Sequence, residues 1–258
     1  MSDEDVSSEP EFGTMAAWTV DAVGALGDDH ALAAACRGSG GPAALGWFAE
    51  HLQLGAGVRL LDVGAGMGGP AAWARATAGA VPVLVEPMEA ACRAATDLFA
   101  LAPIVATAEH LPLGDATVGR AWSLGVLCTT SDQRAALGEV ARVLEPGGAC
   151  GLLVYVRTVA DLDTEPEVNH FPVEDELRAL VDVAGLAVTG EASLSDLPDP
   201  PASWRAQEEA VDDWIEQAHG HTDAWQDAHD DEAAVGHLLQ TGQVVGRLLV
   251  VAREGARR

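Results

Sequence analysis

Lysine is absent from this chain, so its 14 basic residues are all arginines, and 40 aspartates and glutamates outnumber them. The formal net charge at neutral pH is −26. An acidic surface of this kind repels nucleic-acid phosphates and anionic lipid headgroups. We therefore expect a small molecule, and neither nucleic acid nor a membrane, as the partner, while a homodimer stays open as the assembly.

Cysteine is scarce, and long apolar runs are missing. The four cysteines lie far apart and form no C-x-x-C pair, which argues against a zinc site or a disulfide framework. No apolar run reaches membrane-spanning length, and the acidic residues 2–11 are unlike the basic start of a signal peptide. The sequence thus predicts reduced thiols, no metal site and a cytoplasmic protein.

The start of the chain lacks strand signals. Residues 1–13 are polar and acidic, and we expect them to be disordered. Residues 14–55 have helical periodicity, and we interpret them as an N-terminal helical entry region. The helices expected there are 15–25, 28–35 and 42–52.

Strands and helices alternate through residues 56–192, and a last apolar run follows at 244–252. Such β-α alternation predicts a Rossmann-like α/β fold, a doubly wound sheet with helices on both faces. The seven expected strands are 58–63, 81–85, 104–106, 121–127, 149–156, 186–189 and 244–252. The helices expected between them are 69–77, 89–98, 133–144 and 174–184.

Residues 193–242 interrupt this alternation. A proline-rich turn at 197–201 precedes two acidic helical stretches, 204–219 and 222–240. Because this insertion separates the last two strands, we predict a helical cap on a domain made of residues 56–192 and 243–253.

The strongest local signal is a glycine cluster, residues 62–69, where the first strand passes into a helix. Glycines permit a sharp turn and a close approach to a ligand, and the helix N-terminus offers free N–H groups. Glu86 ends the second strand, where a carboxylate can accept hydrogen bonds from both ribose hydroxyls of a nucleoside.

The glycine spacing alone is ambiguous. Gly64, Gly66 and Gly69 also satisfy the dinucleotide-binding fingerprint, which leaves an NAD-dependent oxidoreductase open. Two features favour a ligand without a pyrophosphate. Asp62 precedes the first glycine within the strand, and residues 137–148 form a segment that dinucleotide enzymes do not usually carry.

These features together resemble the class I S-adenosylmethionine-dependent methyltransferases, in the broad group that includes the ubiquinone/menaquinone-biosynthesis type. The matching segments are 61–69, 83–88, 108–112 and 137–148, in the family's order. The resemblance implies S-adenosyl-L-methionine as cofactor and methyl transfer to an oxygen, nitrogen or carbon of a small molecule. It also implies a seven-stranded sheet whose last strand is antiparallel.

The resemblance assigns a cofactor site position by position. Glu86 would hold the ribose hydroxyls, and Met88 would pack against the adenine. Thr107 stands where family members often have aspartate, so one hydrogen bond replaces a charge-assisted contact with the adenine amino group. Arg37, in the entry region, would pair with the cofactor's carboxylate. The other expected contacts are Asp62, Gly64, Ala65, Gly66, Gly68, Pro87, Ala108, Glu109, Leu124 and Gly125.

Chemistry on the acceptor side is less defined, because an activated sulfonium methyl needs mainly an aligned nucleophile. A base is needed only if the acceptor must lose a proton. His170 is our candidate, since it follows the fifth strand and imidazole titrates near neutral pH. Cys128, Tyr155 and Trp18 are candidate substrate contacts, although Trp18 also suits the attachment of a cap.

The large cap favours a medium-sized, partly apolar acceptor, such as a specialised metabolite. A non-methylating relative, either a binding protein or a cyclase, stays open as an alternative because Thr107 is altered and no base is evident. The sequence does not name the acceptor or the attacked atom.

Overall fold

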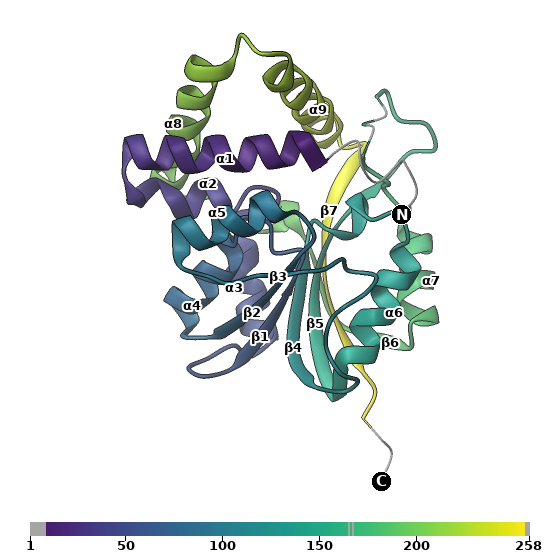
Figure 1. The fold of residues 1–258 in the computed structure, drawn as a ribbon. Helices are drawn as coiled ribbons and strands as arrows, with labels where there is room; N and C mark the ends of the chain where they lie inside the picture. The colour runs from purple at the N-terminus through teal and green to yellow at the C-terminus, as the bar shows by residue number, and fades with distance from the viewer. Residues whose placement is uncertain (1–8, 165, 167, 256–258) are drawn as a thin grey trace.

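A computed structural model describes residues 9–164, 166 and 168–255. Across these residues seven strands form one sheet in the order β3-β2-β1-β4-β5-β7-β6 (Figure 1). The pairs among β1 to β5 are parallel, and β7 runs antiparallel to β5 and β6. The expected α/β sheet with an antiparallel last strand is confirmed. The strands are β1 Arg59–Val63, β2 Val81–Glu86, β3 Ile104–Val105, β4 Val118–Leu124, β5 Leu144–Arg157, β6 Leu186–Ser193 and β7 Val244–Arg253.

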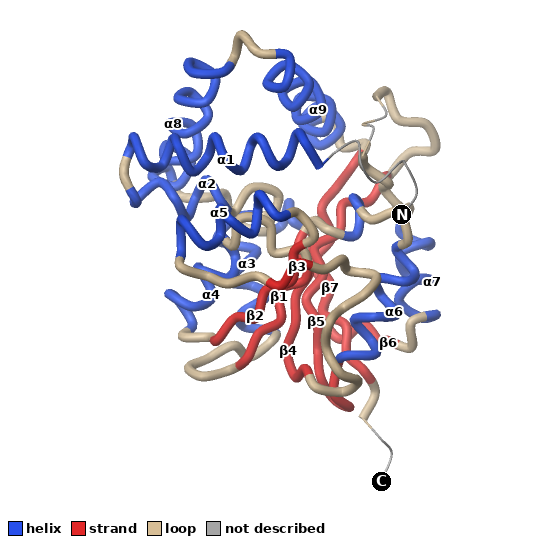
Figure 2. The backbone as a smooth tube through the Cα atoms, viewed as in Figure 1, coloured by secondary structure: helices blue, strands red, loops and turns tan. Residues whose placement is uncertain are grey.

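Helices cover both faces of the sheet (Figure 2). On one face α6 and α7 pack over β1, β4, β5 and β7 around buried residues such as Leu137, Leu152 and Leu177. On the other face α3 and α4 pack over the same sheet around Phe48, Leu60 and Trp122. The helices below the cap are α1 Glu9–Leu26, α2 Ala31–Ala35, α3 Gly41–His51, α4 Gly69–Ala78, α5 Glu89–Phe99, α6 Gln133–Val143 and α7 Glu174–Val183.

The insertion before β7 contains two long helices, α8 (Ala202–His219) and α9 (Asp223–Gln240), preceded by a short 3-10 turn at Leu194–Asp196. We call α8 and α9 the cap. In Figure 1 the two helices rise above α1, at the end of the sheet where the parallel strands finish. Val211 and Ile215 of α8 are buried against residues of α1 and α2. The described helices include none long and apolar enough to cross a bilayer.

The N-terminal expectations need correction. Helix α1 begins at Glu9, so residues 9–13, expected to be disordered, are helical. Pro10 lies in the first turn, where a missing N–H and a fixed φ are tolerated. The expected helix 28–35 is a 3-10 turn, Asp28–His30, followed by α2. Residues 1–8 of the expected tail lie outside the described part of the chain.

The boundaries around β4 and β5 also differ from expectation. Strand β4 begins at Val118 and ends at Leu124, because Gly125 leaves the extended conformation with φ +77°. Helix α6 ends at Val143, and β5 already begins at Leu144, which pairs with Val118. The proline-glycine segment after α6 therefore lies in an irregular start of β5, which only the pairing with β4 could reveal.

Candidate active site

The glycine cluster at residues 62–69, the glycine turn, connects β1 to α4. Gly64, Gly66 and Gly68 all have positive φ, which strains any residue with a side chain. A Cβ at Gly64 would lie 2.3 Å from Val126 Cγ2, and one at Gly69 would lie 2.3 Å from the backbone oxygen of Ala35. A Cβ at Gly66 would meet nothing within 4 Å. The turn therefore presents bare backbone to an open space at Gly66 between close-packed neighbours.

Glu86, at the end of β2, fastens this turn. Its Oε2 accepts a hydrogen bond from the Gly66 N–H at 2.8 Å, and Oε1 accepts one from Met88 N–H at 3.0 Å. The residue is 3% exposed. Burial raises the pKa of Glu86, and the two N–H donors partly offset that rise. Each carboxylate oxygen has two lone pairs, so Glu86 can keep both contacts and still accept ribose hydroxyls.

Asp62 lies in β1, at the first position of the glycine turn, and is buried. Within the described residues its Oδ2 has no hydrogen-bond partner; burial raises the pKa of Asp62 to about 7, and the nearby Trp122 side chain partly offsets that rise. A buried carboxylate oxygen without a partner is costly unless a ligand donates to it. A nucleoside with an amino-acid tail supplies such donors, so Asp62 and Glu86 fit the expected cofactor.

A short loop, residues 36–40, connects α2 to α3, and we call it the entry segment. A Cβ on Gly125, at the end of β4, would lie 2.8 Å from the Gly38 carbonyl oxygen. The Tyr155 hydroxyl donates to that same oxygen at 3.2 Å, and burial raises the pKa of Tyr155 to about 12, so it keeps its proton. The entry segment thus lies against Gly125, directly after β4, and against Tyr155 of β5.

Arg37, in the entry segment, faces the cap. Its guanidinium forms an ion pair with Asp212 of α8, its Nε is buried with no hydrogen-bond partner in the described part of the chain, and burial lowers the pKa of Arg37. Glu208 also lies near this guanidinium, and it accepts a hydrogen bond from the Trp204 ring N–H at 3.0 Å. Sequence reasoning missed Asp212 and Glu208, because in an acidic helix nothing marks which carboxylates face inward.

The segment expected to contact adenine, residues 107–110, starts at the same edge of the sheet. The Ala106 N–H donates to the Glu86 carbonyl at 3.3 Å, which ties the segment to the end of β2. Ala108 is buried, whereas Thr107 is exposed and Glu109 is half-buried. Pro87 and Met88 follow Glu86 at this edge.

On the acceptor side an apolar cluster lies under α9. Cys128 is buried there, its Sγ donates to the Gly125 carbonyl at 3.1 Å, and burial raises the pKa of its thiol to about 11. A thiol with a raised pKa is a poor nucleophile, so Cys128 can line a site but not attack. The cluster joins it to Phe171, Leu238 and Val244, with Tyr155, Leu162 and Val235 packed against it. Leu238 and Val235 belong to an acidic helix and were not expected from the sequence.

His170 reaches this region through its backbone. Its N–H donates to the Cys128 carbonyl at 2.6 Å, and its carbonyl accepts from Gln133 Nε2 at 2.8 Å. The residue is exposed and borders an open hollow of about 470 Å³, together with residues of the α6 and α7 N-termini. The loop is therefore anchored beside Cys128, while the imidazole is accessible to solvent.

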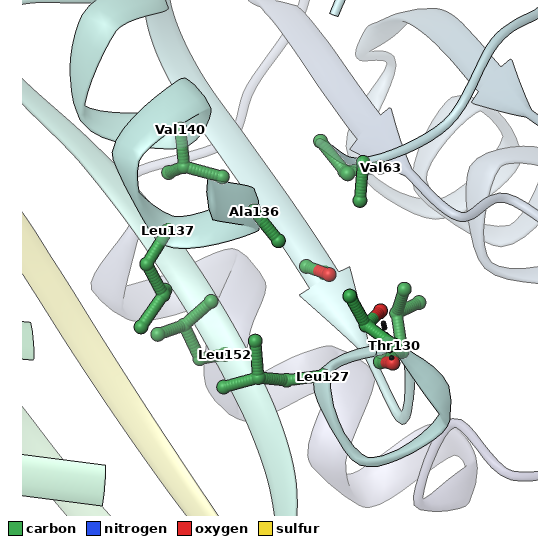
Figure 3. A pocket seen from close by; sticks show the side chains of 10 residues that line it. Val63, Leu127, Thr130, Ala136, Leu137, Val140 and Leu152 are labelled. Atoms are coloured by element: carbon green, nitrogen blue, oxygen red, sulfur yellow. Dashed lines mark hydrogen bonds between the residues drawn. The ribbon is translucent and has the colours of Figure 1, made fainter. Parts of the chain in front are cut away.

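Two further places bear on the site. A cavity of about 10 Å³ lies between the end of β4 and α6, next to Thr130, whose hydroxyl donates to the Val126 carbonyl (Figure 3). It is too small for a cofactor and belongs to core packing.

Trp18 stacks on His219 with ring centroids 4.2 Å apart and packs with cap residues, not with Cys128 and Tyr155. Among the described residues no three His, Cys, Asp or Glu side chains are grouped to hold a metal ion.

Comparison with known proteins agrees with this geometry. A family described as a methyltransferase domain matches residues 61–152. The chain is 31% identical over 222 residues to the 27-O-demethylrifamycin SV methyltransferase of Amycolatopsis mediterranei, covering 76% of this chain and 80% of that protein. It is 29% identical over 171 residues to methyltransferase GfsG of Streptomyces halstedii, covering 58% of this chain and 60% of GfsG, less than two thirds of its length.

Among solved structures, the [4+2]-cyclase SpnF has the same fold. The TM-score is 0.66 at 22% identity, and the match covers 82% of this chain and 80% of that one. The family match spans the glycine turn, Glu86 and β4. The chain therefore belongs to the class I S-adenosylmethionine-dependent methyltransferases, and S-adenosylmethionine is its cofactor.

Proposed function

We propose that this protein methylates a hydroxyl group on a medium-sized, partly apolar specialised metabolite. One observation carries the proposal: the Val126 side chain packs on Gly64 of the glycine turn, and two residues further on the thiol of Cys128 donates to the Gly125 carbonyl. The glycine turn and the apolar cluster under α9 thus adjoin through residues 125–128. The rifamycin relative, whose name identifies an O-demethyl acceptor, supports oxygen as the attacked atom.

The residues of this chain would act mainly by binding and alignment. S-Adenosylmethionine supplies an electrophilic methyl group when bound. Glu86 would hold the ribose hydroxyls, Asp62 would accept from the amino group of the methionine tail, and Arg37 would meet its carboxylate. The glycines of the turn let the backbone approach the ligand closely. Met88 and residues 107–109 would flank the adenine.

The acceptor would lie against Cys128 and Tyr155, in an apolar region that excludes water from the methyl group. His170 is proposed as the base that takes the hydroxyl proton, an assistance typically worth about 10²- to 10⁴-fold. Its backbone contact with Cys128 supports this location. A substrate contact by Trp18 stays a prediction, since Trp18 packs with the cap.

Location and assembly belong to the same proposal. We place the protein in the cytoplasm, and the net charge of −26 supports action on a small molecule and not on nucleic acid. Light scattering of the purified protein distinguishes a monomer from the proposed homodimer.

Calorimetry with S-adenosylhomocysteine tests the cofactor site. We expect Glu86→Ala to weaken binding by about 100-fold, because two ribose hydroxyls lose a charged acceptor. Glu89→Ala is the matched control, since that carboxylate is 73% exposed and forms an ion pair with Arg93 on the helix surface. Equal binding by wild type and Glu86→Ala would contradict the proposed site.

A transfer assay tests the reaction. Labelled S-adenosylmethionine should pass its methyl group to hydroxylated metabolites of a panel, and His170→Ala should slow turnover without weakening S-adenosylhomocysteine binding. Cofactor binding without any methyl transfer would favour the binding-protein or cyclase alternative. A nicotinamide cofactor found in the purified protein would instead favour the oxidoreductase.

A further inference from the structure

Segment 137–148 matches the family yet lies on α6 and the start of β5, away from the glycine turn. We infer that Arg142 and Glu139 of this segment are positioning residues, which hold the loop between β3 and β4 so that residues 107–110 meet the adenine of the cofactor. The inference rests on the proposed function for the adenine contact. It assigns a task to two residues that touch neither the glycine turn nor Glu86.

Arg142 uses all five N–H donors of its guanidinium, which has a fixed fork geometry. Nη1 donates to the Leu113 carbonyl and to Asp115 Oδ1, both at 2.8 Å, and Nη2 donates to the Leu111 carbonyl at 3.0 Å. The remaining donors bind Glu139, from Nε at 2.6 Å and from Nη2 at 2.7 Å. One side chain therefore fixes three points of the loop.

Glu139, on the same face of α6 as Arg142, also binds the loop. Its Oε2 also accepts a hydrogen bond from the Leu111 N–H at 2.8 Å. Both backbone polar groups of Leu111 are thus held by the pair. The hydrogen bond from Arg142 lowers the pKa of Glu139, so the carboxylate stays ionised and the pair stays charge-assisted.

The loop is fixed at two ends and open between them. At one end the Ala106 N–H is bound by the carbonyl of Glu86, the residue proposed to hold the ribose. At the other end Leu111 is buried in the core and bound by Arg142 and Glu139. Residues 107–110 lie between these anchors, with a turn closed by the His110 N–H and the Thr107 carbonyl at 3.2 Å. Releasing the second anchor frees the adenine segment without touching the ribose site.

Helix α6 can act as a rigid support because its own end is fixed. Nη1 of Arg253, in β7, donates to the carbonyls of Arg142 and Leu144 at 3.1 and 2.6 Å. The Arg142 carbonyl also accepts from the Ala116 N–H at 2.9 Å. The last turn of α6 is thereby tied to the sheet, so that displacement of the loop is resisted by the core.

The test compares two ligands that differ in the base. S-Adenosylhomocysteine carries adenine, whereas S-ribosylhomocysteine lacks it, and the affinity of the second is measured by competition with the first. We expect Arg142→Met to weaken S-adenosylhomocysteine by about tenfold, and Arg142→Lys by about threefold because lysine keeps the charge but loses the fork. S-Ribosylhomocysteine should change by less than about twofold, since the ribose and tail contacts remain. The KM for S-adenosylmethionine should rise while kcat changes little.

Arg178→Met is the matched control, because Arg178 of α7 also binds two carboxylates, Glu174 and Glu191, but no part of the loop. It should leave both affinities unchanged. Equal weakening of both ligands by the Arg142 variants, or no weakening of either, would overturn the inference. If Arg142→Met does not fold, Arg142→Lys and Asp115→Asn decide the outcome by the same ligand comparison. A wild type that fails to bind S-adenosylhomocysteine contradicts the proposed function instead.

Discussion

The sheet and the cap are built differently. The sheet buries large apolar side chains on both faces, among them Leu60, Trp122, Leu152 and Leu153, all under 2% exposed. In the cap, α8 buries Trp204, Val211 and Ile215, and α9 buries Leu238 alone among its 18 residues. A stacked ring pair supplies part of the attachment, since Trp18 of α1 stacks on His219 of α8.

Because of this difference, we expect the sheet to be more rigid than the cap. Local stability follows the amount of buried apolar contact, so the cap should open at a lower free energy than the sheet unfolds. The glycine turn and Glu86 belong to the sheet. The proposed acceptor region, in contrast, includes Val235 and Leu238 of α9. At the proposed site, cofactor binding would rest on the sheet and acceptor choice on the cap.

Substitutions at two equally buried positions test whether the sheet and the cap differ in local stability. Leu153, in β5, and Ile215, in α8, are 0% and 1% exposed. We expect Leu153→Ala to lower the free energy of global unfolding by about 3 kcal/mol, through lost burial and a new cavity. Hydrogen exchange should then show lost protection in the sheet, while cap amides, which exchange through local opening, stay unchanged.

Ile215→Ala should give the opposite pattern, with faster exchange first in α8, α9 and the adjoining part of α1. Loss of protection in sheet and cap together in Leu153→Ala would show that the two regions unfold as one cooperative unit.

The ion pair between Arg37 and Asp212 joins the two regions and gives a sharper test. Asp212 is 51% exposed, so the pair itself contributes little stability. We expect Arg37→Met to weaken S-adenosylhomocysteine by about tenfold, because a charged donor to its carboxylate is lost. Asp212→Asn should change that affinity by less than about twofold. Equal effects in calorimetry would assign Arg37 to cap attachment alone.

The pH dependence of Asp62 is the smallest expected effect. Burial raises the pKa of Asp62 to about 7, so the folded protein keeps a proton that the unfolded chain releases above about pH 4. This contribution to stability is present below about pH 4 and is lost as pH rises to about 7. The Tm of the cofactor-free protein should therefore fall across this window relative to Asp62→Asn.

The control for Asp62 is Asp213→Asn, at an exposed position of the cap helix α8. A constant Tm difference between wild type and Asp62→Asn from pH 4.5 to 8 would show that Asp62 is ionised throughout this range. The carboxylate would then have a hydrogen-bond donor that the described residues do not supply.

Much of the fold could be predicted because its signals are local. The apolar run ending at Val63 and the glycine turn lie within a few residues of each other, and β1 and α4 follow that pattern. The error at the start of β5 lies where strand pairing decides the structure. Nothing near Leu144 predicts a strand partner, and only its contact with Val118 places it in β5.

The candidate site divides in the same way. Asp62 and Glu86 were identified because an acidic residue at a strand end is visible in the sequence. The partners of Arg37 were not, because Glu208 and Asp212 lie about 175 residues further along the chain, in a helix with many equivalent carboxylates. The contacts of Arg142 with the Leu111 and Leu113 carbonyls were missed for a related reason, since every residue has a backbone carbonyl.

The sequence by itself determined the α/β alternation, the glycine turn and its two acidic residues, since these depend on periodicity, turn conformation and local order. The tertiary structure decided which side chains face each other: Asp212 beside Arg37, Leu238 beside Cys128, and Leu111 between Glu139 and Arg142. The physical reason is that burial and hydrogen bonding select partners by distance in space, and the chain brings distant residues together only after its elements have packed.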